Sequence, residues 1–328
     1  GNLHVPDAVA DVLDAIREKL PVKLSEAKMQ PPTPTIPPNQ SNTTVITAKD
    51  MESHHDTTVQ QALQCVTGVT VNEMVPGISS YVKLNGDDRV LILVDGQSLA
   101  NAQGSGYGRG SVDLTSLPGV GAIDHIEVTK GSGSVRYGSG AVGGVINIVT
   151  KKGDRRESSL YAYTGSWGMH GYTLTHSGRA GATSWLVSGD LEQRAYYAFP
   201  HGANTDHSRG DIARKSLSLR LDQDLTDHTS LTVKAYHQDY HGHGSTYKAD
   251  PAGWYLTANK PIDRLINDYS VTYHFKKETA QPGFLRYFND YQRTYWSNHY
   301  FTRTQGPIMK PIISTKNVII RLSMPKMP

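Results

Sequence analysis

A glycine-rich segment is the first place in the sequence where residue spacing suggests binding chemistry. Gly138, Gly140 and Gly143 match the spacing of the dinucleotide-binding fingerprint. That fingerprint needs a strand before it and a helix after it, because the pyrophosphate binds at the N-terminus of the helix. Here the apolar, β-branched residues 145–149 follow, and they predict a strand. The segment therefore argues against nucleotide binding, and a lysine-bearing phosphate loop is also missing from the sequence.

Histidine pairs offer a second kind of chemistry. His201 and His207 fall in one predicted long loop, and His241 and His243 fall in another. Imidazole nitrogens bind haem iron and divalent transition metals, so these four residues are candidate haem or metal ligands. The chain has 14 histidines in 328 residues, which makes chance pairs common. Ligand capture is therefore kept as a hypothesis beside the simpler interpretation of solvated loop residues.

Other classes of function find no support in the residues. Paired carboxylates, a serine–histidine arrangement and a metalloprotease motif are absent in any supporting context, so we expect neither an enzyme nor a bound cofactor. The net charge of +3 comes without a dense run of lysine and arginine, which argues against nucleic acid. Cys65 is the one cysteine, which excludes a disulfide and a cysteine-based metal site within the chain.

The first half of the chain predicts a tether and then a small α+β domain. Residues 5–20 have the spacing of a short amphipathic helix, and residues 31–40 contain five prolines and predict an extended spacer. The domain spans residues 42–153. Thr57 and Gln60 suggest a capping box at the start of one of its helices. The apolar positions of that helix are Val59, Ala62, Leu63 and Val66.

The second half, residues 154–328, alternates between apolar and polar residues. Leu217, Leu219 and Leu221, for example, alternate with polar neighbours. Short links alternate with long ones at 194–214 and 241–267, which is typical of outer-membrane barrels, although a soluble β-sandwich could give the same alternation. About seven strands are expected, near residues 158–165, 171–178, 184–193, 215–222, 230–240, 268–276 and 284–296.

Three stretches of the small domain carry a family resemblance. Residues 90–96 (VLILVDG), 123–131 (IDHIEVTKG) and 135–153 (VRYGSGAVGGVINIVTKKG) resemble the plug domain of TonB-dependent outer-membrane receptors. The resemblance covers about a third of the chain and implies a membrane β-barrel with an α+β N-terminal plug. Asn85 stands where the family usually has arginine, which predicts the loss of one plug-to-barrel ion pair.

The resemblance also implies a function. It indicates an outer-membrane receptor that imports a metal chelate of the siderophore, haem or cobalamin class, an iron or cobalt complex, and that contacts outer-membrane lipid. Its partner would be TonB with the inner-membrane energising complex. The TonB box of the receptor would pair with TonB as an added β-strand. The substrate-contact candidates in the upper plug loops are Tyr81, Tyr107 and Arg109. The candidate TonB box consists of Val22, Lys23, Leu24, Ser25, Glu26 and Ala27.

Seven strands are about a third of the number that a plugged barrel needs. We therefore expect an incomplete barrel, from a truncated or frameshifted receptor or from one chain of a split receptor. Two alternatives remain open. One is a signalling, bacteriocin-binding or phage-binding receptor with the same fold, and the other is a soluble β-rich binding protein.

Overall fold

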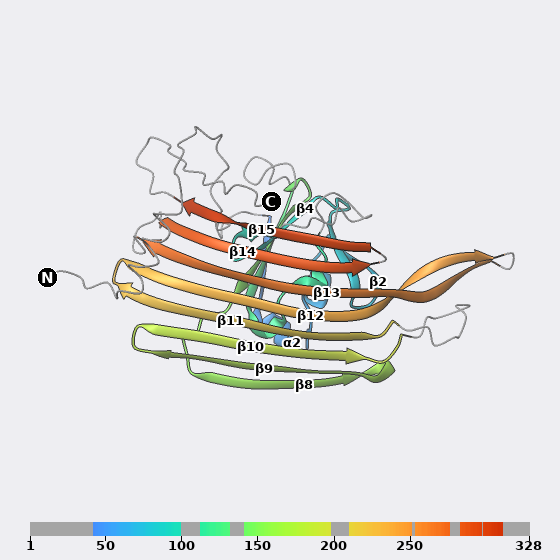
Figure 1. The fold of residues 1–328 in the computed structure, drawn as a ribbon, viewed down its shortest axis with the longest axis horizontal. Helices are drawn as coiled ribbons and strands as arrows, with labels where there is room; N and C mark the ends of the chain where they lie inside the picture. The colour runs from blue at the N-terminus through green and yellow to red at the C-terminus, as the bar shows by residue number, and fades with distance from the viewer. Residues whose placement is uncertain are drawn as a thin grey trace.

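The chain forms a small mixed domain and one large antiparallel sheet that lies against it (Figure 1). The computed structural model describes residues 42–99, 112–131, 141–197, 210–250, 253–275, 283–296 and 298–310. The predicted helix at residues 5–20 and the proline-rich spacer lie outside these ranges. Within them, the structure contains no helix that is long and apolar enough to cross a membrane.

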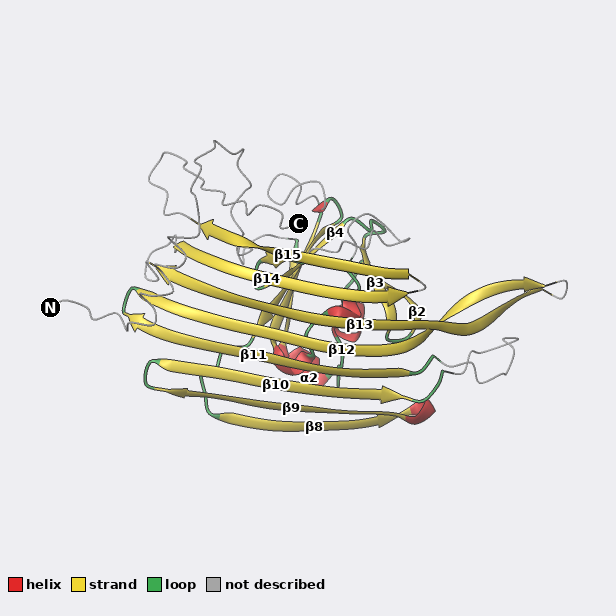
Figure 2. Cartoon of the chain, in the orientation of Figure 1, coloured by secondary structure: helices red, strands yellow, loops and turns green. Residues whose placement is uncertain are grey.

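The small domain, called the inner domain below, is built on a five-stranded mixed sheet in the order β1-β6-β7-β4-β5. Strands β4 and β7 are parallel, and the other neighbours are antiparallel. A separate hairpin, β2–β3, and short helical turns complete the domain (Figure 2). The elements are β1 (Thr43–Thr47), α2 (Ala48–Ser53), α3 (Val59–Gln64), β2 (Val69–Val75), β3 (Ile78–Leu84), β4 (Val90–Val94), β5 (Gln97–Ser98), η1 (Leu114–Ser116), η2 (Val120–Ala122), β6 (Ile123–Lys130) and β7 (Gly144–Thr150).

One apolar core holds the inner domain together. Ile126, Ile146 and Ile148 from the sheet are at most 1% exposed and pack with the buried face of α3. The predicted core positions of that helix are all buried, as expected. The predicted capping box is wrong by one residue, because Thr58 is the N-cap and exchanges hydrogen bonds with Gln61.

The large sheet, called the wall sheet below, is an eight-stranded meander in which each strand pairs with the next one in the sequence. Strands β8 and β15 lie at its two edges, so the sheet is not closed within the described part of the chain. This agrees with the expected incomplete barrel. The strands are β8 (Glu157–Gly165), β9 (Met169–Ala180), β10 (Thr183–Arg194), β11 (Ile212–Thr226), β12 (Thr229–Asp250), β13 (Gly253–Phe275), β14 (Gly283–Trp296) and β15 (Asn298–Lys310).

The two faces of the wall sheet have opposite chemistry. Along β11, Arg214, Ser216, Ser218 and Arg220 are buried against the inner domain, whereas the alternating leucines of the strand are 40–43% exposed on the other face. A soluble sheet would bury its leucines and expose its arginines. This inverted pattern is that of a membrane barrel, with lipid outside and a polar lumen inside, and it removes the β-sandwich alternative.

Two sequence expectations about the wall sheet are wrong. Residues 241–267 do not form a long loop, because β12 and β13 remain paired as far as Asp250 and Gly253 in a hairpin that extends beyond the neighbouring strands (Figure 1). The eighth strand, β15, was also missed. Both segments lack clear alternation in the sequence, and their strands are identified by backbone pairing with the neighbouring strand. Pro307 lies in β15, which within the described residues has a neighbour on one side only, a position that proline tolerates.

Candidate functional site

The candidate functional site is the interface between the inner domain and the wall sheet. Three segments of the inner domain contact the wall: residues 112–122, the β4–β5 turn at Asp95, and the β2–β3 turn at Pro76 and Gly77. Polar side chains of β10–β14 meet these segments. Each of the three contacts has its own chemistry.

The segment 112–122 carries the most buried ion pair of the interface. Asp113 caps the short helix η1 and pairs with Arg264 of β13, and the two side chains are 7% and 3% exposed. Arg264 also donates to Thr115 Oγ1 at 2.7 Å and lies 5.3 Å from the centre of the Tyr240 ring. Asp113 Oδ1 accepts from the backbone nitrogens of Ser80 at 3.1 Å and Thr115 at 3.0 Å. The two buried charges therefore compensate each other in a fixed geometry.

Backbone carbonyls of the same segment are bound by wall side chains. Gln238 Nε2 donates to the carbonyl of Thr115 at 2.9 Å, and the Tyr236 hydroxyl donates to the carbonyl of Leu117 at 3.0 Å. Such contacts do not depend on the side chains of the segment. They tie the backbone of η1 to the centre of β12.

Glycine is required where this segment crosses the wall. A Cβ atom on Gly121 would lie 2.6 Å from Thr173 Cγ2, 2.8 Å from Thr175 Oγ1 and 2.9 Å from Ser188 Oγ. A Cβ atom on Gly119 would lie 2.4 Å from the carboxylate oxygens of Asp190. These separations are too short for any side chain, so the backbone of η2 lies directly on the wall.

Gly143 and Gly144, from the glycine-rich segment of the sequence, do not make such an approach to the wall. A Cβ atom on Gly143 would meet Asp87, and one on Gly144 would meet the carbonyl of Thr129 and the side chain of Leu84. These glycines pack within the inner domain. Residues 132–140 lie outside the described ranges.

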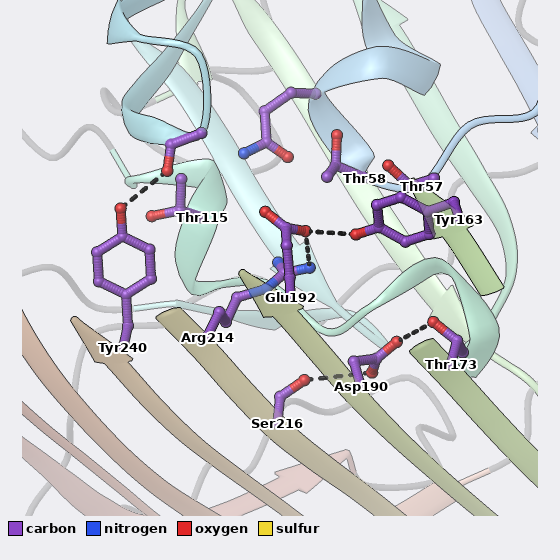
Figure 3. A network of polar contacts seen from close by, with 12 residues as sticks. Thr57, Thr58, Thr115, Tyr163, Thr173, Asp190, Glu192, Arg214, Ser216 and Tyr240 are labelled. Atoms are coloured by element: carbon purple, nitrogen blue, oxygen red, sulfur yellow. Dashed lines mark hydrogen bonds and ion pairs between the residues drawn. The ribbon is translucent and has the colours of Figure 1, made fainter. Parts of the chain in front are cut away.

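The wall side chains beneath η2 are ordered by one another. Glu192 accepts hydrogen bonds from the Tyr163 hydroxyl at 2.9 Å and from Arg214 at 3.1 Å (Figure 3). Asp190, two residues earlier on β10, accepts from Thr173 at 2.8 Å and Ser216 at 3.2 Å. These contacts connect side chains of β8, β9, β10 and β11, so the polar surface under the inner domain has hydrogen bonds of its own within the wall.

The β4–β5 turn forms the second contact. Asp95 has φ 49° in a two-residue Asp-Gly turn and pairs with Lys234 of β12. It also accepts from the backbone nitrogen of Thr150 at 3.0 Å and from its hydroxyl at 2.7 Å, while Arg220 donates to Thr150 Oγ1 at 2.9 Å. Burial by itself would raise the pKa of Asp95, but the Lys234 ammonium and these hydrogen bonds hold that pKa below its ordinary 3.8. The carboxylate is therefore charged at any pH near neutrality.

The β2–β3 turn forms the third contact. Arg194 donates to the carbonyl of Pro76 at 2.6 Å, and the Tyr240 hydroxyl donates to the carbonyl of Gly77 at 2.9 Å. The next residue, Ile78, is fully buried in a small apolar cluster with Ile212, Tyr240 and Ile262 of the wall. Inside the hairpin, burial raises the pKa of Glu73, although its carboxylate accepts from Ser80 and Gly77.

A cavity of about 130 Å³ lies between the second contact and the wall. Its lining combines apolar side chains, such as Leu99, Leu186 and Ile266, with charged and amide-bearing ones. The polar lining includes Asp95, Gln97, Lys234, Arg286 and Asp290.

The predicted substrate-contact and TonB-box residues are placed as follows. Tyr81 lies in β3 and is buried, with 8% of its surface exposed. Tyr107, Arg109, His201, His207 and the candidate TonB box at residues 22–27 lie outside the described ranges. A role in substrate contact or TonB binding stays a prediction for all of these residues.

His241 and His243 lie on the outer face of β12. Their neighbour Tyr240 points to the inner domain, so the alternation of the strand directs both histidines away from it. As a result they supply no ligand to the interface described above.

Asn85 has a local structural role. It has φ 49° in the turn before Gly86, a conformation that asparagine adopts more easily than arginine, and its backbone nitrogen donates to the carbonyl of Gly68 at 2.8 Å. Although Asn85 cannot form an ion pair with the wall, the inner domain forms two others, through Asp95 and Asp113.

Sequence reasoning missed the residues that make the interface. Asp113, Arg264 and Lys234 stand out only as charged residues, and pairing them requires the fold. One signal was available on the wall side. Arg214 and Arg220 occupy alternate positions to the leucines of the same strand, so the arginines and the leucines face opposite sides of the sheet. In a barrel, that pattern assigns the arginines to the lumen.

Comparisons with known proteins bring these features together. Residues 38–145 match the family described as the TonB-dependent receptor plug domain. The chain is 31% identical over 208 residues to the iron-regulated outer membrane virulence protein of Vibrio cholerae. The alignment covers 58% of this chain and 30% of that protein. The chain therefore spans less than a third of the length of this curated relative.

Solved structures share the fold. The ferric enterobactin receptor PfeA from Pseudomonas aeruginosa matches with a TM-score of 0.60 and 19% identity, covering 81% of this chain and 44% of that chain. The siderophore receptor PirA from Acinetobacter baumannii matches with a TM-score of 0.60 and 20% identity, covering 77% and 40%. A chain of the FpvAI–pyocin S2 complex matches with a TM-score of 0.63 and 16% identity, covering 78% of this chain and 34% of that chain.

Proposed function

We propose that the chain belongs to the TonB-dependent receptors of the outer membrane, and that the whole receptor imports a ferric siderophore with energy supplied through TonB. In this proposal the inner domain is the plug and the wall sheet is part of the surrounding barrel. Iron regulation in the name of the Vibrio cholerae relative and siderophore binding in the names of the structural relatives support this substrate class.

The observation that carries the proposal is the polar character of the plug–wall interface. Two ion pairs and a set of hydrogen bonds connect the plug to the wall, and one small apolar cluster at Ile78 accompanies them. An apolar interface would have to expose its area to water if the plug moved, at roughly 25 cal/mol per Å². Polar groups can exchange their partners for water, so the plug can shift without a large hydrophobic loss.

The three contacts suggest how such a shift would proceed. The cavity beside Asp95 leaves room for this turn to move, and its polar lining residues Gln97 and Asp290 offer alternative hydrogen-bond partners as the contacts of the turn break. The Asp113–Arg264 pair is more deeply buried and would hold longest, since separating it exposes two charges that now compensate each other. We infer that force applied through the N-terminal segment, with residues 22–27 as the candidate TonB box, is used mainly at this pair.

Among the chelate classes, a siderophore fits better than haem. The histidines proposed for haem capture in the 241–267 region, His241 and His243, face away from the plug. The substrate would instead meet the upper plug loops, where Tyr107 and Arg109 remain the proposed contacts, whereas the third candidate, Tyr81, is a buried residue of β3. An arginine and tyrosine set suits an anionic catecholate or carboxylate chelate, because guanidinium binds such oxygens directly and tyrosine can donate to them.

Binding and uptake experiments can test the proposal. The chain in detergent micelles is titrated with a ferric catecholate siderophore, with haem and with cobalamin, using intrinsic fluorescence quenching. The ferric siderophore should bind, and Tyr107→Ala and Arg109→Ala should each weaken it by about tenfold or more. Arg89→Ala serves as the control, because Arg89 is exposed and pairs locally with Asp87. Preferential binding of haem or cobalamin, or equal binding by all variants, would overturn the assignment of substrate and contacts.

Uptake is tested separately in cells that lack their own receptor for the same siderophore. Cells that produce the receptor should accumulate radioactive iron from the ferric siderophore, and deletion of tonB in the same cells should abolish accumulation while binding at the surface persists. Accumulation that is independent of TonB would contradict the proposed energy source.

A further inference from the structure

A cluster of histidine and aspartate side chains lies on the outer face of the wall, outside the plug–wall interface. His243 Nδ1 lies 2.9 Å and 3.0 Å from the two carboxylate oxygens of Asp211, and His241 Nδ1 is hydrogen-bonded to Asp263. The two imidazole rings are 5.1 Å apart and nearly perpendicular. One ligand atom from each of Asp211, His241 and His243 lies within 4.8 Å of the other two.

The cluster lies at the outer border of the apolar belt of the wall. On β11 the outward leucines end at Leu217, which pairs across the strands with His237. His241 is four residues further along β12, which corresponds to about 13 Å at 3.3 Å per residue. The outward residues between these two levels are mixed, because Lys215 and Asp239 are charged while Leu265, which pairs with Asp239, is apolar. The cluster lies at the base of the long β12–β13 hairpin.

The chemistry of the cluster is that of a transition-metal site. Two imidazoles at positions i and i+2 of a strand point to the same side, and a carboxylate from the neighbouring strand end completes three ligands. Such a set favours Zn²⁺, Ni²⁺ or Cu²⁺ over Mg²⁺ or Ca²⁺, which prefer oxygen ligands. Asp263 fits the usual second partner of a metal-bound histidine, since a carboxylate on Nδ1 orients the ring and leaves Nε2 available for the metal.

We propose that Asp211, His241 and His243 form a surface site for a divalent transition metal, with Asp263 orienting His241. The bound metal joins the start of β11 to β12 and so stiffens the base of the hairpin. The site faces away from the lumen, so it is separate from the proposed siderophore path and does not depend on that function. The exposure of His241, with 49% of its side chain accessible, lets the metal enter without a conformational change.

Metal titration of the full chain in detergent micelles tests the site. All variants carry Cys65→Ser, because His54, Asp56 and Cys65 form a second group whose ligand atoms lie within 4.8 Å of one another and could also bind metal. Zn²⁺ binding is measured by calorimetry. His241→Ala, His243→Ala and Asp211→Asn should each weaken the tightest site by about tenfold or more. His237→Ala is the matched control, since His237 is exposed on the same face of the same strand and is hydrogen-bonded to Asn267 at 2.8 Å.

Cu²⁺ electron paramagnetic resonance provides a readout of the ligands themselves. The parent chain should show two coupled imidazole nitrogens, and each histidine variant should show one. Circular dichroism establishes that each variant is folded, and Asp211→Asn tests the site without altering a histidine. If Zn²⁺ affinity is unchanged in all three site variants, or falls equally in His237→Ala, the side chains are paired by hydrogen bonds alone and the proposal is overturned.

Discussion

The buried pair of Asp113 and Arg264 allows a quantitative test of how the plug is held in the barrel. Removal of one partner leaves the other charge desolvated, which typically costs about 3–5 kcal/mol of unfolding free energy. Arg264→Met should lie near the lower figure, because Asp113 keeps its hydrogen bonds from Ser80 and Thr115. Asp113→Asn should lie near the upper figure, because the buried Arg264 charge then has no carboxylate to compensate it, and its Nε has no hydrogen-bond partner among the described residues.

The measurement is urea unfolding of the chain in detergent micelles, followed by circular dichroism and tryptophan fluorescence. The double variant Asp113→Asn/Arg264→Met should be less destabilised than the sum of the single variants, with a coupling of at least about 1 kcal/mol. Arg179→Met is the control, because Arg179 and Asp224 form an ion pair at 2.8 Å with side chains 45% and 38% exposed. That pair should contribute less than about 1 kcal/mol. If Arg264→Met costs no more than Arg179→Met, the assignment of a desolvated plug anchor is refuted.

Three further predictions concern the other parts of the interface. Gly121→Ala should destabilise the folded chain by about 1–3 kcal/mol in the same urea assay, because its Cβ atom would overlap three wall side chains. The control Gly189→Ala should have little effect, because its Cβ atom would meet only the carbonyl of Ser216 at 3.9 Å. Equal losses in the two variants would contradict the close approach of Gly121 to the wall. The pKa of Asp95 is lowered, so the contribution of this carboxylate to stability is complete above pH 3.8 and is lost as the pH falls further. Asp95→Asn should remove this acid-dependent loss of stability. An unchanged acid profile in that variant would count against the ion pair. The pKa of Glu73 is raised by burial above its ordinary 4.5, so stability falls as the pH rises through that raised value; Glu73→Gln should flatten the stability curve there, and a persisting slope would assign it to another group.

Much of the architecture was available from the sequence because it depends on local patterns. The strict alternation around Leu217–Leu221 identified the wall strands, and the stretch at residues 145–149 excluded the helix that a nucleotide site needs. Helix-period spacing likewise identified the buried face of α3. Such periodicities follow from backbone geometry, which repeats every 2 residues in a strand and every 3.6 in a helix, so they are visible without the fold.

The lengths of the outer strands were less accessible. Residues 241–260 have little apolar–polar alternation in the sequence, so the pattern that identified the other wall strands is missing there. The strands continue there because backbone groups pair across the hairpin, and those hydrogen bonds depend on the partner strand rather than on side chains.

The plug–wall interface was decided by tertiary structure. Asp113 and Arg264 are 151 residues apart, and the spacing of charges along a chain contains no information on which of them meet when a domain sits inside a sheet. The same holds for Gly121, whose need for glycine comes from Thr173, Thr175 and Ser188 on the wall. The sequence alone determined the kind of protein, because family motifs and strand periodicity are local. Only the fold determined which residues hold the plug and which histidines face away from it, because those properties depend on contacts between distant segments.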